Sequence, residues 1–340
     1  MRLWTDIIDP ATLTGYVRTA LEDIERQRGS LARYLPNRLV PDINVRFVAG
    51  QAGLVAEAEF RAYDAPPTRG GKPGGKRTTL ELPAIGRSIP ITEYEQLRTR
   101  NASDEVMLRE ILNTGRLVAQ AVSSRMERLR GTVLSTGVAT ISELGAADSF
   151  GRRASHTVTA GSLWSSATSV SRLADLQAWA DLYEETNGVA PGQIVTSRRV
   201  LRVLAAGDEF KINLVGGGSR AATVDDVNAI VEGHGLPPIE VLSRRTSGGR
   251  VLPETELLML PEPVEPDAWE ETQLGASFWG QTLSSQEPGW ELADDEQPGI
   301  VVGAFRSDTI PMIAEAQSDA IAMPVLANAD LSLKATVIAA

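Results

Sequence analysis

The sequence contains no cysteine and only two histidines, His156 and His234. The absence of cysteine excludes disulfide bonds, thiolate catalysis and zinc sites built on sulfur. Two isolated histidines leave little for metal binding or for proton transfer near neutral pH, the range in which histidine titrates. We therefore expect no catalytic residue, no metal and no cofactor, and we interpret each histidine as a surface or capping residue.

Long apolar runs are also missing. No segment is long enough to cross a bilayer, and Met1 to Asp9 lacks the hydrophobic core of a signal peptide, so we expect no membrane partner. Hydrophobic residues make up 42% of the chain and charged residues 23%, which is typical of a folded globular protein. With 340 residues, the chain can hold one elaborate domain or two ordinary ones.

Lysine and arginine are absent between Val251 and Ile300, a segment that is rich in acidic residues. The net charge of -11 disfavours a dedicated nucleic-acid binder, but it does not exclude a protein that only encloses nucleic acid. Opposite charges on one chain favour head-to-tail self-association. We predict that a basic segment (Arg69, Lys72, Lys76, Arg77) docks on an acidic surface of the next subunit (Glu262, Glu265, Asp267, Glu270, Glu271).

The stretch from Asp104 to Ser135 predicts one long helix. Its apolar residues recur every three or four positions on one face (Leu108, Ile111, Leu112, Val118, Val122, Met126, Leu129, Val133). We expect its polar residues, which include Glu127 and Arg130, to face solvent or a polar partner. About thirty residues at ~1.5 Å each span roughly 45 Å. Gly115 and the lack of heptads argue against a coiled coil, so we interpret the helix as a strut.

Before this helix, the sequence predicts a helix, an extended arm and two alternating strands (12–28, 31–47, 54–61 and 78–91). The segment 66–77, rich in glycine and proline, is too long for a tight turn. We predict a long two-stranded arm with a mobile basic tip. An isolated hairpin is marginally stable in water, so this arm needs a neighbour to lie on.

After the strut helix, the pattern predicts a compact α+β unit and then mainly strands. The expected helices are 171–185, 198–206 and 223–232. The expected strands are 193–196, 239–242, 256–260, 277–282, 300–305 and 330–337. The stretch 131–159 has no clear pattern.

Two glycine-rich segments match phosphate-binding loops only in part. Gly70 to Lys76 fits most of G-x-x-x-x-G-K-[ST], but Arg77 replaces the hydroxyl residue and no helix follows. Gly216 to Ser219 lacks a strand–turn–helix context, and the acidic segment lacks the residue order of a calcium loop. We interpret both glycine-rich segments as loops. The tryptophans are expected to be core or interface anchors (Trp164, Trp179, Trp269, Trp279, Trp290).

The order of these parts resembles a tailed-phage major capsid protein with the Hong Kong 97-type fold, and within that fold the lambda-type major capsid protein E family. The most specific pieces lie near the two ends of the chain. The first is the run Asp9 to Arg18, followed by Leu35 to Asn37, and the second comprises 311–315, 321–324 and 329–337. The resemblance covers nearly the whole chain, and neither piece is a catalytic signature.

The resemblance implies an α+β fold with an N-terminal arm (1–50), an E-loop hairpin (51–92), a peripheral domain with its spine helix (93–190, helix 104–135), an axial domain (191–300) and strands that return to the peripheral domain (301–340). It implies a major capsid protein that forms hexamers and pentamers in an icosahedral phage head around double-stranded DNA, assembled in the host cytoplasm. In some relatives an E-loop lysine forms an isopeptide bond, and Lys72 and Lys76 lie in that part, without local support for the chemistry.

The family also implies a portal, a decoration protein and, because the arm begins almost at once, a separate scaffolding protein. A mildly acidic shell surrounds DNA without gripping it. Two alternatives stay open. The first is an encapsulin-like nanocompartment shell, although encapsulins generally have a short E-loop. The second is a hydrolase or nucleotide-binding enzyme, against which the missing cysteine, the isolated histidines and the incomplete phosphate loop all count.

Overall fold

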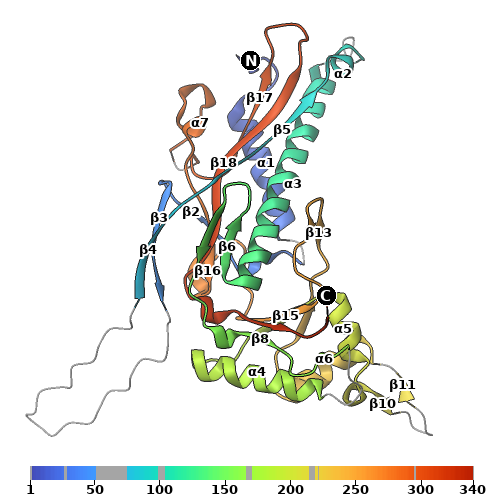
Figure 1. Cartoon of the computed structure of the whole chain (residues 1–340). Helices are drawn as coiled ribbons and strands as arrows, with labels where there is room; N and C mark the ends of the chain where they lie inside the picture. Colours follow the sequence, from blue (N-terminus) through green and yellow to red (C-terminus); the bar gives the residue numbers. More distant parts are fainter. Residues whose placement is uncertain are drawn as a thin grey trace, which may run out of the picture.

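Helix α3 (Asp104–Thr136) runs along the long axis of the molecule, where the sequence predicts a strut (Figure 1). The structure is a computed structural model that describes residues 2–26, 29–50, 75–98, 104–165, 171–213, 219–220, 222–294 and 296–339. Most of the apolar face predicted for α3 is buried (Ile111, Val118, Val122, Met126, Leu129, Val133). The predicted long helix is therefore confirmed.

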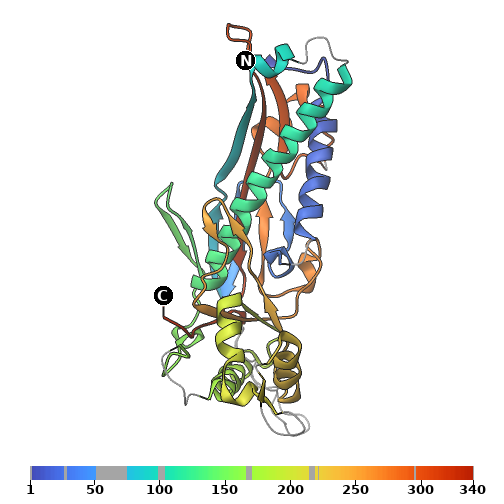
Figure 2. The ribbon, with the colours of Figure 1, turned by 90° about the vertical axis from the view of Figure 1, so that its right-hand side faces the viewer.

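Helix α1 (Pro10–Glu25) lies along α3 and confirms the predicted N-terminal helix (Figure 2). It begins earlier than expected because Pro10 suits a first helical position and the Asp9 carboxylate accepts a hydrogen bond from the Thr12 N–H at 2.8 Å. Gly115 does not interrupt α3. A Cβ at this position would lie 3.2 Å from Leu13 Cδ1, so the glycine lets the two helices approach closely.

A six-stranded sheet packs against these two helices and combines strands from distant parts of the chain. Its order is β1 (Arg2–Leu3), β17 (Val301–Arg306), β18 (Ala314–Leu326), β16 (Gly275–Trp279) and β2 (Asn37–Leu39), and β5 (Ala84–Ile91) also pairs with β18. The predicted strands near β16 and β17 are confirmed. The sequence pattern does not predict β18, because its first half consists of small and polar residues and its second half contains Pro324.

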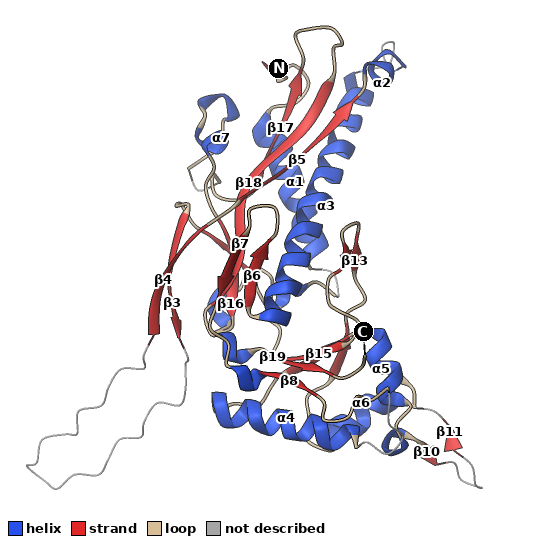
Figure 3. Cartoon of the chain, viewed as in Figure 1, coloured by secondary structure: helices blue, strands red, loops and turns tan. Residues whose placement is uncertain are grey.

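A five-stranded sheet lies at the other end of the molecule (Figure 3). Its order is β12 (Ile239–Val241), β9 (Gln193–Thr196), β15 (Glu256–Leu260), β19 (Leu333–Thr336) and β8 (Thr157–Thr159). Helices α4 (Arg172–Asn187), α5 (Arg198–Ala205) and α6 (Val224–Gly233) contribute to the same apolar core, and all three are predicted from the sequence. The sequence predicts a domain boundary at residue 300. In the structure, β16 comes before this residue but belongs to the six-stranded sheet with β17 and β18, whereas β19 comes after it but belongs to the five-stranded sheet with β9 and β15. Both sheets therefore contain strands from either side of residue 300, and the domain division stays a prediction.

Among the described residues, four two-stranded pairs lie outside the two sheets: β3 (Asn44–Gly50) with β4 (Gly75–Glu81), β6 (Val138–Ile141) with β7 (Ala146–Ser149), β13 (Arg245–Thr246) with β14 (Gly249–Arg250), and the short β10 (Ile212–Asn213) with β11 (Ser219–Arg220). The prediction of one strand over 78–91 is wrong. The chain leaves the β3–β4 hairpin at Leu82 and Pro83, buries Leu82, and enters the large sheet as β5. The predicted strand over 54–61 lies outside the described residues.

The remaining elements are short: α2 (Glu93–Arg98), α7 (Leu283–Gln286) and single turns of 3-10 helix, of which η1 (Leu31–Arg33), η4 (Trp269–Glu271) and η5 (Pro288–Trp290) matter below. The arm predicted over 31–47 therefore contains η1, β2 and the start of β3. In the part of the chain that the structure describes, no helix is both long and apolar enough to cross a membrane.

Candidate subunit-interface site

The acidic residues predicted to receive a neighbouring subunit lie between β15 and β16. Five carboxylates on this segment are exposed (Glu262, Glu265, Asp267, Glu270, Glu271). Asp267 is paired within the chain, since its Oδ2 lies 3.6 Å from Arg26 Nη2. The ring of Trp269, at the start of η4, is covered by the guanidinium of Arg38 at 3.9 Å from its centroid. The structure thus brings the predicted acidic residues together on one exposed segment.

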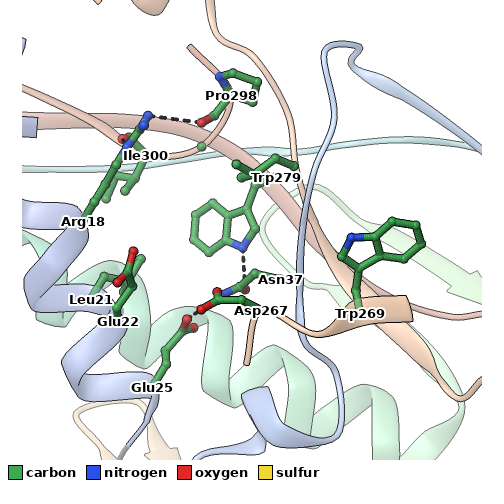
Figure 4. Close-up of a pocket in the computed structure, with 12 residues that line it drawn as sticks. Arg18, Leu21, Glu22, Glu25, Asn37, Asp267, Trp269, Trp279, Pro298 and Ile300 are labelled. Carbon is green, nitrogen blue, oxygen red and sulfur yellow. Dashed lines mark hydrogen bonds between the residues drawn. The ribbon is translucent and has the colours of Figure 1, made fainter. Parts of the chain in front are cut away.

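A hollow of about 500 Å³ lies between this segment, α1 and β2 (Figure 4). Arg18 crosses one side of the hollow, where Nε donates to the Ile300 carbonyl at 2.9 Å and Nη2 donates to the Pro298 carbonyl at 3.1 Å. Burial lowers the pKa of this guanidinium, whereas the charges of Glu296 and Glu22 oppose that shift. Arg18 thereby holds the loop before β17 against α1.

A buried ionic cluster centred on Arg130 of α3 adjoins the hollow, which two members of the cluster, Glu25 and Asn37, line. Its Nη1 lies 2.7 Å from Glu25 Oε1 and 2.9 Å from Glu127 Oε1, while Nη2 donates to Asn37 Oδ1 at 2.7 Å and Nε donates to Ser277 Oγ at 2.8 Å. Burial alone would lower the pKa of Arg130, but the two carboxylates outweigh it and raise that pKa, so the guanidinium stays charged. The cluster joins α3, α1, β2 and β16.

The carboxylate of Glu127 extends the same cluster toward the chain that follows α1. It accepts hydrogen bonds from Ser30 Oγ at 2.8 Å and from the Leu31 N–H at 3.0 Å, and Arg244 Nη1 lies 3.6 Å from it. A buried charge is tolerated only when paired and hydrogen-bonded. These contacts fix the N-terminal segment and the β12–β13 connection on the strut helix, so they hold the body of the subunit in one shape.

Glu127 and Arg130 were expected to meet solvent or a polar partner, and the structure gives them buried polar partners. Two signals in the sequence point to this. Arg130 lies four positions after Met126, so both must point to the same side of the helix. Glu25 likewise continues the row of Leu13, Val17 and Leu21 on α1. Neither signal predicts that Glu25 and Arg130 pair with each other, because α1 and α3 come together only when the chain folds.

The basic segment predicted to dock on the acidic residues is only partly described. Arg69 and Lys72 lie outside the described residues. Lys76 and Arg77 belong to β4, where they pair with Ala49 and Val48 of β3 through the backbone, and their side chains are not described. Figure 1 shows the β3–β4 hairpin standing away from the rest of the molecule. The docking itself stays a prediction.

The other residues singled out from the sequence are placed as follows. The prediction of a surface or capping role is wrong for His156, which is buried with its ring 6.2 Å from that of Tyr183. The same prediction is confirmed for His234, the C-cap residue of α6, whose Nδ1 lies 2.8 Å from the Ile230 carbonyl oxygen. Among the described residues, no group of three or more histidines and carboxylates could hold a metal ion.

The expected loops and anchors can be checked in part. Of the two segments interpreted as loops, 70–74 and 216–218 lie outside the described residues, whereas Gly75 and Lys76 begin β4 and Ser219 begins β11. Four of the five tryptophans predicted to be anchors are core residues, because Trp164, Trp179, Trp279 and Trp290 are buried, and the rings of the first two stack at 6.0 Å. Trp269 is the exception, being only partly buried beneath Arg38.

The comparison with protein families decides what kind of protein has this architecture. A family model described as "Phage major capsid protein E" matches residues 16–266, which is most of the chain. The chain belongs to this family. The matched range includes most of α1, all of α3, the predicted basic segment and the first half of the acidic segment 262–271. No curated protein matches the chain.

Solved structures support the fold of a phage major capsid protein. A protein described as the capsid protein of a prophage (E. coli CFT073) is similar over 98% of this chain and 99% of its own, with a TM-score of 0.63 and 15% identity. A phage-related protein from Bordetella bronchiseptica RB50 is similar over 96% of each chain, with a TM-score of 0.59 and 15% identity. The expected α+β fold of the Hong Kong 97 type is confirmed.

Proposed function

We propose that this chain is the major capsid protein of a phage head, a structural protein that self-assembles as hexamers and pentamers into an icosahedral shell around double-stranded DNA. The observation that carries the proposal is the family match over residues 16–266. Two features of the subunit suit the role. The buried cluster around Arg130 keeps the long body rigid, and the projecting β3–β4 hairpin offers surface to neighbours.

Negative-stain microscopy of the purified protein tests this proposal. We expect closed icosahedral shells, with the portal, scaffolding and decoration proteins as further partners that co-expression of neighbouring genes would supply. The contents of the shells separate the two kinds of container, because DNA indicates a phage head and protein cargo an encapsulin-like compartment. Compact monomers or dimers under all these conditions would contradict the proposal, and turnover of ester or nucleotide substrates that a point substitution abolishes would revive an enzymatic role.

The family's domain names are part of the proposal: an N-terminal arm (1–50), an E-loop (51–92), a peripheral domain (93–190), an axial domain (191–300) and returning strands (301–340). Limited proteolysis of shells and of free subunits tests the E-loop assignment. We expect cleavage within 51–92 in free subunits and protection in shells, because assembly would lay this segment on a neighbour. Equal cleavage in both states would contradict the assignment.

We further propose that the basic residues of the E-loop dock on the acidic segment of the next subunit. The support is charge complementarity between Arg69, Lys72, Lys76 and Arg77 and the exposed carboxylates on 262–271. The paired substitution Lys72→Glu with Lys76→Glu should weaken assembly, and more strongly at low salt, where charges are less screened. The matched control is Arg198→Glu with Arg202→Glu on the exposed side of α5. Assembly equal to that of the control would discard this docking.

A further inference from the structure

A second hollow, of about 880 Å³, lies between α3, β5 and the β6–β7 and β13–β14 hairpins. Four arginines and one glutamate line it (Arg87, Arg125, Arg128, Arg245, Glu143). Two large apolar side chains among its lining residues face solvent, since Leu117 is 50% exposed and Leu144 is 64% exposed. We call this surface the arginine groove.

The charges of the arginine groove are only partly balanced inside the chain. Arg125 Nη2 lies 2.7 Å from Glu143 Oε2, and Arg128 Nη1 donates to the Gly248 carbonyl at 3.0 Å. Arg87 and Arg245 are exposed, and neither forms an ion pair with any residue in the described ranges. The groove therefore combines exposed leucines with excess positive charge, which is the composition of an interface that receives an acidic, partly apolar partner.

An element with the complementary composition lies on the opposite flank of the same chain. Helix α7 begins with Leu283, which is 83% exposed, and exposed carboxylates follow it without any lysine or arginine (Glu287, Glu291, Asp294, Glu296). Figure 1 shows α7 standing out on one side of the large sheet, while the β13–β14 hairpin lies on the other side, beyond α3. We call residues 283–296 the acidic flank.

We propose that the acidic flank of one subunit binds in the arginine groove of a second copy of this chain. Leu283 would contact Leu117 and Leu144, and the carboxylates would pair with Arg87 and Arg245. The two surfaces differ and lie on opposite flanks, so the contact is head-to-tail, and such contacts close into rings when the rotation between subunits allows it. The inference rests on the proposed function and names the surfaces that would join neighbouring subunits.

The acidic flank fits this groove better than two other acidic partners do. The segment 262–271 has less free charge, because Asp267 is already paired with Arg26. It also has no large exposed apolar side chain, since Trp269 is covered by Arg38. Double-stranded DNA would satisfy the arginines through its phosphates, but a phosphate backbone gives the exposed leucines Leu117 and Leu144 no apolar contact.

Disulfide trapping tests the contact directly, because the natural chain has no cysteine. In the double variant Leu144→Cys/Leu283→Cys, oxidation should link successive copies into a ladder of covalent oligomers, whereas each single variant can form at most a covalent dimer. The control pairs Leu283→Cys with Leu97→Cys, an exposed position of α2 outside the groove. A control ladder as strong as that of Leu144→Cys/Leu283→Cys, or no ladder at all, would overturn the proposal.

Charge reversal tests the same contact by assembly yield. Arg87→Glu/Arg245→Glu and Glu287→Arg/Glu291→Arg should each lower the yield of shells by about tenfold or more, since each places like charges opposite one another. Their combination in one chain restores complementarity and should return the yield to within about threefold of wild type. Arg198→Glu/Arg202→Glu serves as the control for altered net charge, and circular dichroism of the free subunits checks the fold.

Three results would overturn the inference: normal yield from both reversed sets, a combination no better than its parts, or shells of normal yield that lose DNA when the arginines are reversed. The last result would assign the groove to DNA instead. Failure of the proposed function looks different, because the wild-type chain would then form no shells. The cross-linking ladder would still decide whether the two surfaces meet.

Discussion

The guanidinium of Arg130 and the carboxylate of Glu25 form a fully buried ion pair, Nη1 to Oε1 at 2.7 Å, although the two residues are 105 positions apart. Glu127 shares the same nitrogen at 2.9 Å. Taking three charges out of water costs several kcal/mol per ion, so the cluster is stable only while each charge has its partners. It therefore links the N-terminal helix to the strut helix.

Arg130→Met should lower the free energy of unfolding by about 3–5 kcal/mol, because it leaves Glu25 buried without a cation and Glu127 with only the more distant Arg244, at 3.6 Å. Denaturant unfolding of the free subunit measures this loss. The control is Arg109→Met on the same helix, which removes only an exposed pair with Glu105 and should change stability by about 0.5 kcal/mol or less. Equal effects of the two substitutions would contradict the buried cluster.

Asn37→Leu should cost about 2–3 kcal/mol, because the amide serves three side chains at once. Its Oδ1 accepts from Arg130 Nη2 at 2.7 Å and from Trp279 Nε1 at 2.8 Å, and its Nδ2 donates to Glu25. Loss of the amide leaves buried polar groups unsatisfied. Thermal unfolding gives the change, with Asn113→Leu on the exposed side of α3 as the control. A similar shift in both variants would indicate a nonspecific effect of leucine.

Gly131→Ala and Gly15→Ala should have opposite effects although both glycines lie inside helices. A Cβ at Gly131 would overlap the carbonyl oxygen of Val251, whereas a Cβ at Gly15 meets nothing within 4 Å. We expect Gly131→Ala to destabilise the subunit by about 1–3 kcal/mol through overpacking. Gly15→Ala should stabilise it by about 0.5–1 kcal/mol, since alanine is the better helix former. Unfolding curves that move in the same direction would refute the packing assigned to Gly131.

His156→Phe should make the free energy of unfolding depend less on pH in the range where histidine titrates. Burial lowers the pKa of His156 below its usual 6.5, the charges of Arg152 and Arg153 act in the same direction, and Asp330 opposes the shift. As pH falls below about 6.5, the unfolded chain therefore takes up a proton before the folded one does, and the free energy of unfolding decreases. Urea unfolding curves measured between about pH 7.5 and pH 5 should show a smaller decrease in the free energy of unfolding for His156→Phe than for the wild-type chain. A decrease in His156→Phe as large as that of the wild-type chain would contradict this role of His156.

The elements predicted well are those whose signals are local. Strands β9 and β15 have the predicted bounds, and α4 ends at Asn187 with Gly188 as its C-cap, in the left-handed conformation that the Asn187-Gly188 pair indicates. Each depends on residue spacing and cap chemistry within a few positions, which are present in the sequence itself. The prediction of one continuous strand over 78–91 failed at Leu82. The alternation of apolar and polar residues continues through this position, but Leu82 is buried in the core and the chain passes there from β4 to β5.

Strand β18 shows the same limit more clearly. Its thirteen residues pair with β17 and β16, which precede it in the chain, and with β5, which comes from a distant part of the chain, and Pro324 interrupts its apolar half. Nothing within the segment distinguishes it from a loop. Its pairing partners decide that it is a strand.

By itself, the sequence determined the long helix, the acidic stretch without lysine or arginine and the order of parts that resembles the capsid family, because spacing, charge and order are properties of the chain alone. The tertiary structure decided the burial of Arg130 between Glu25 and Glu127, the burial of His156 and the placing of the arginine groove opposite α7. Those relationships join residues far apart in the sequence, and their energies depend on distance and exclusion of water, which exist only once the chain has folded.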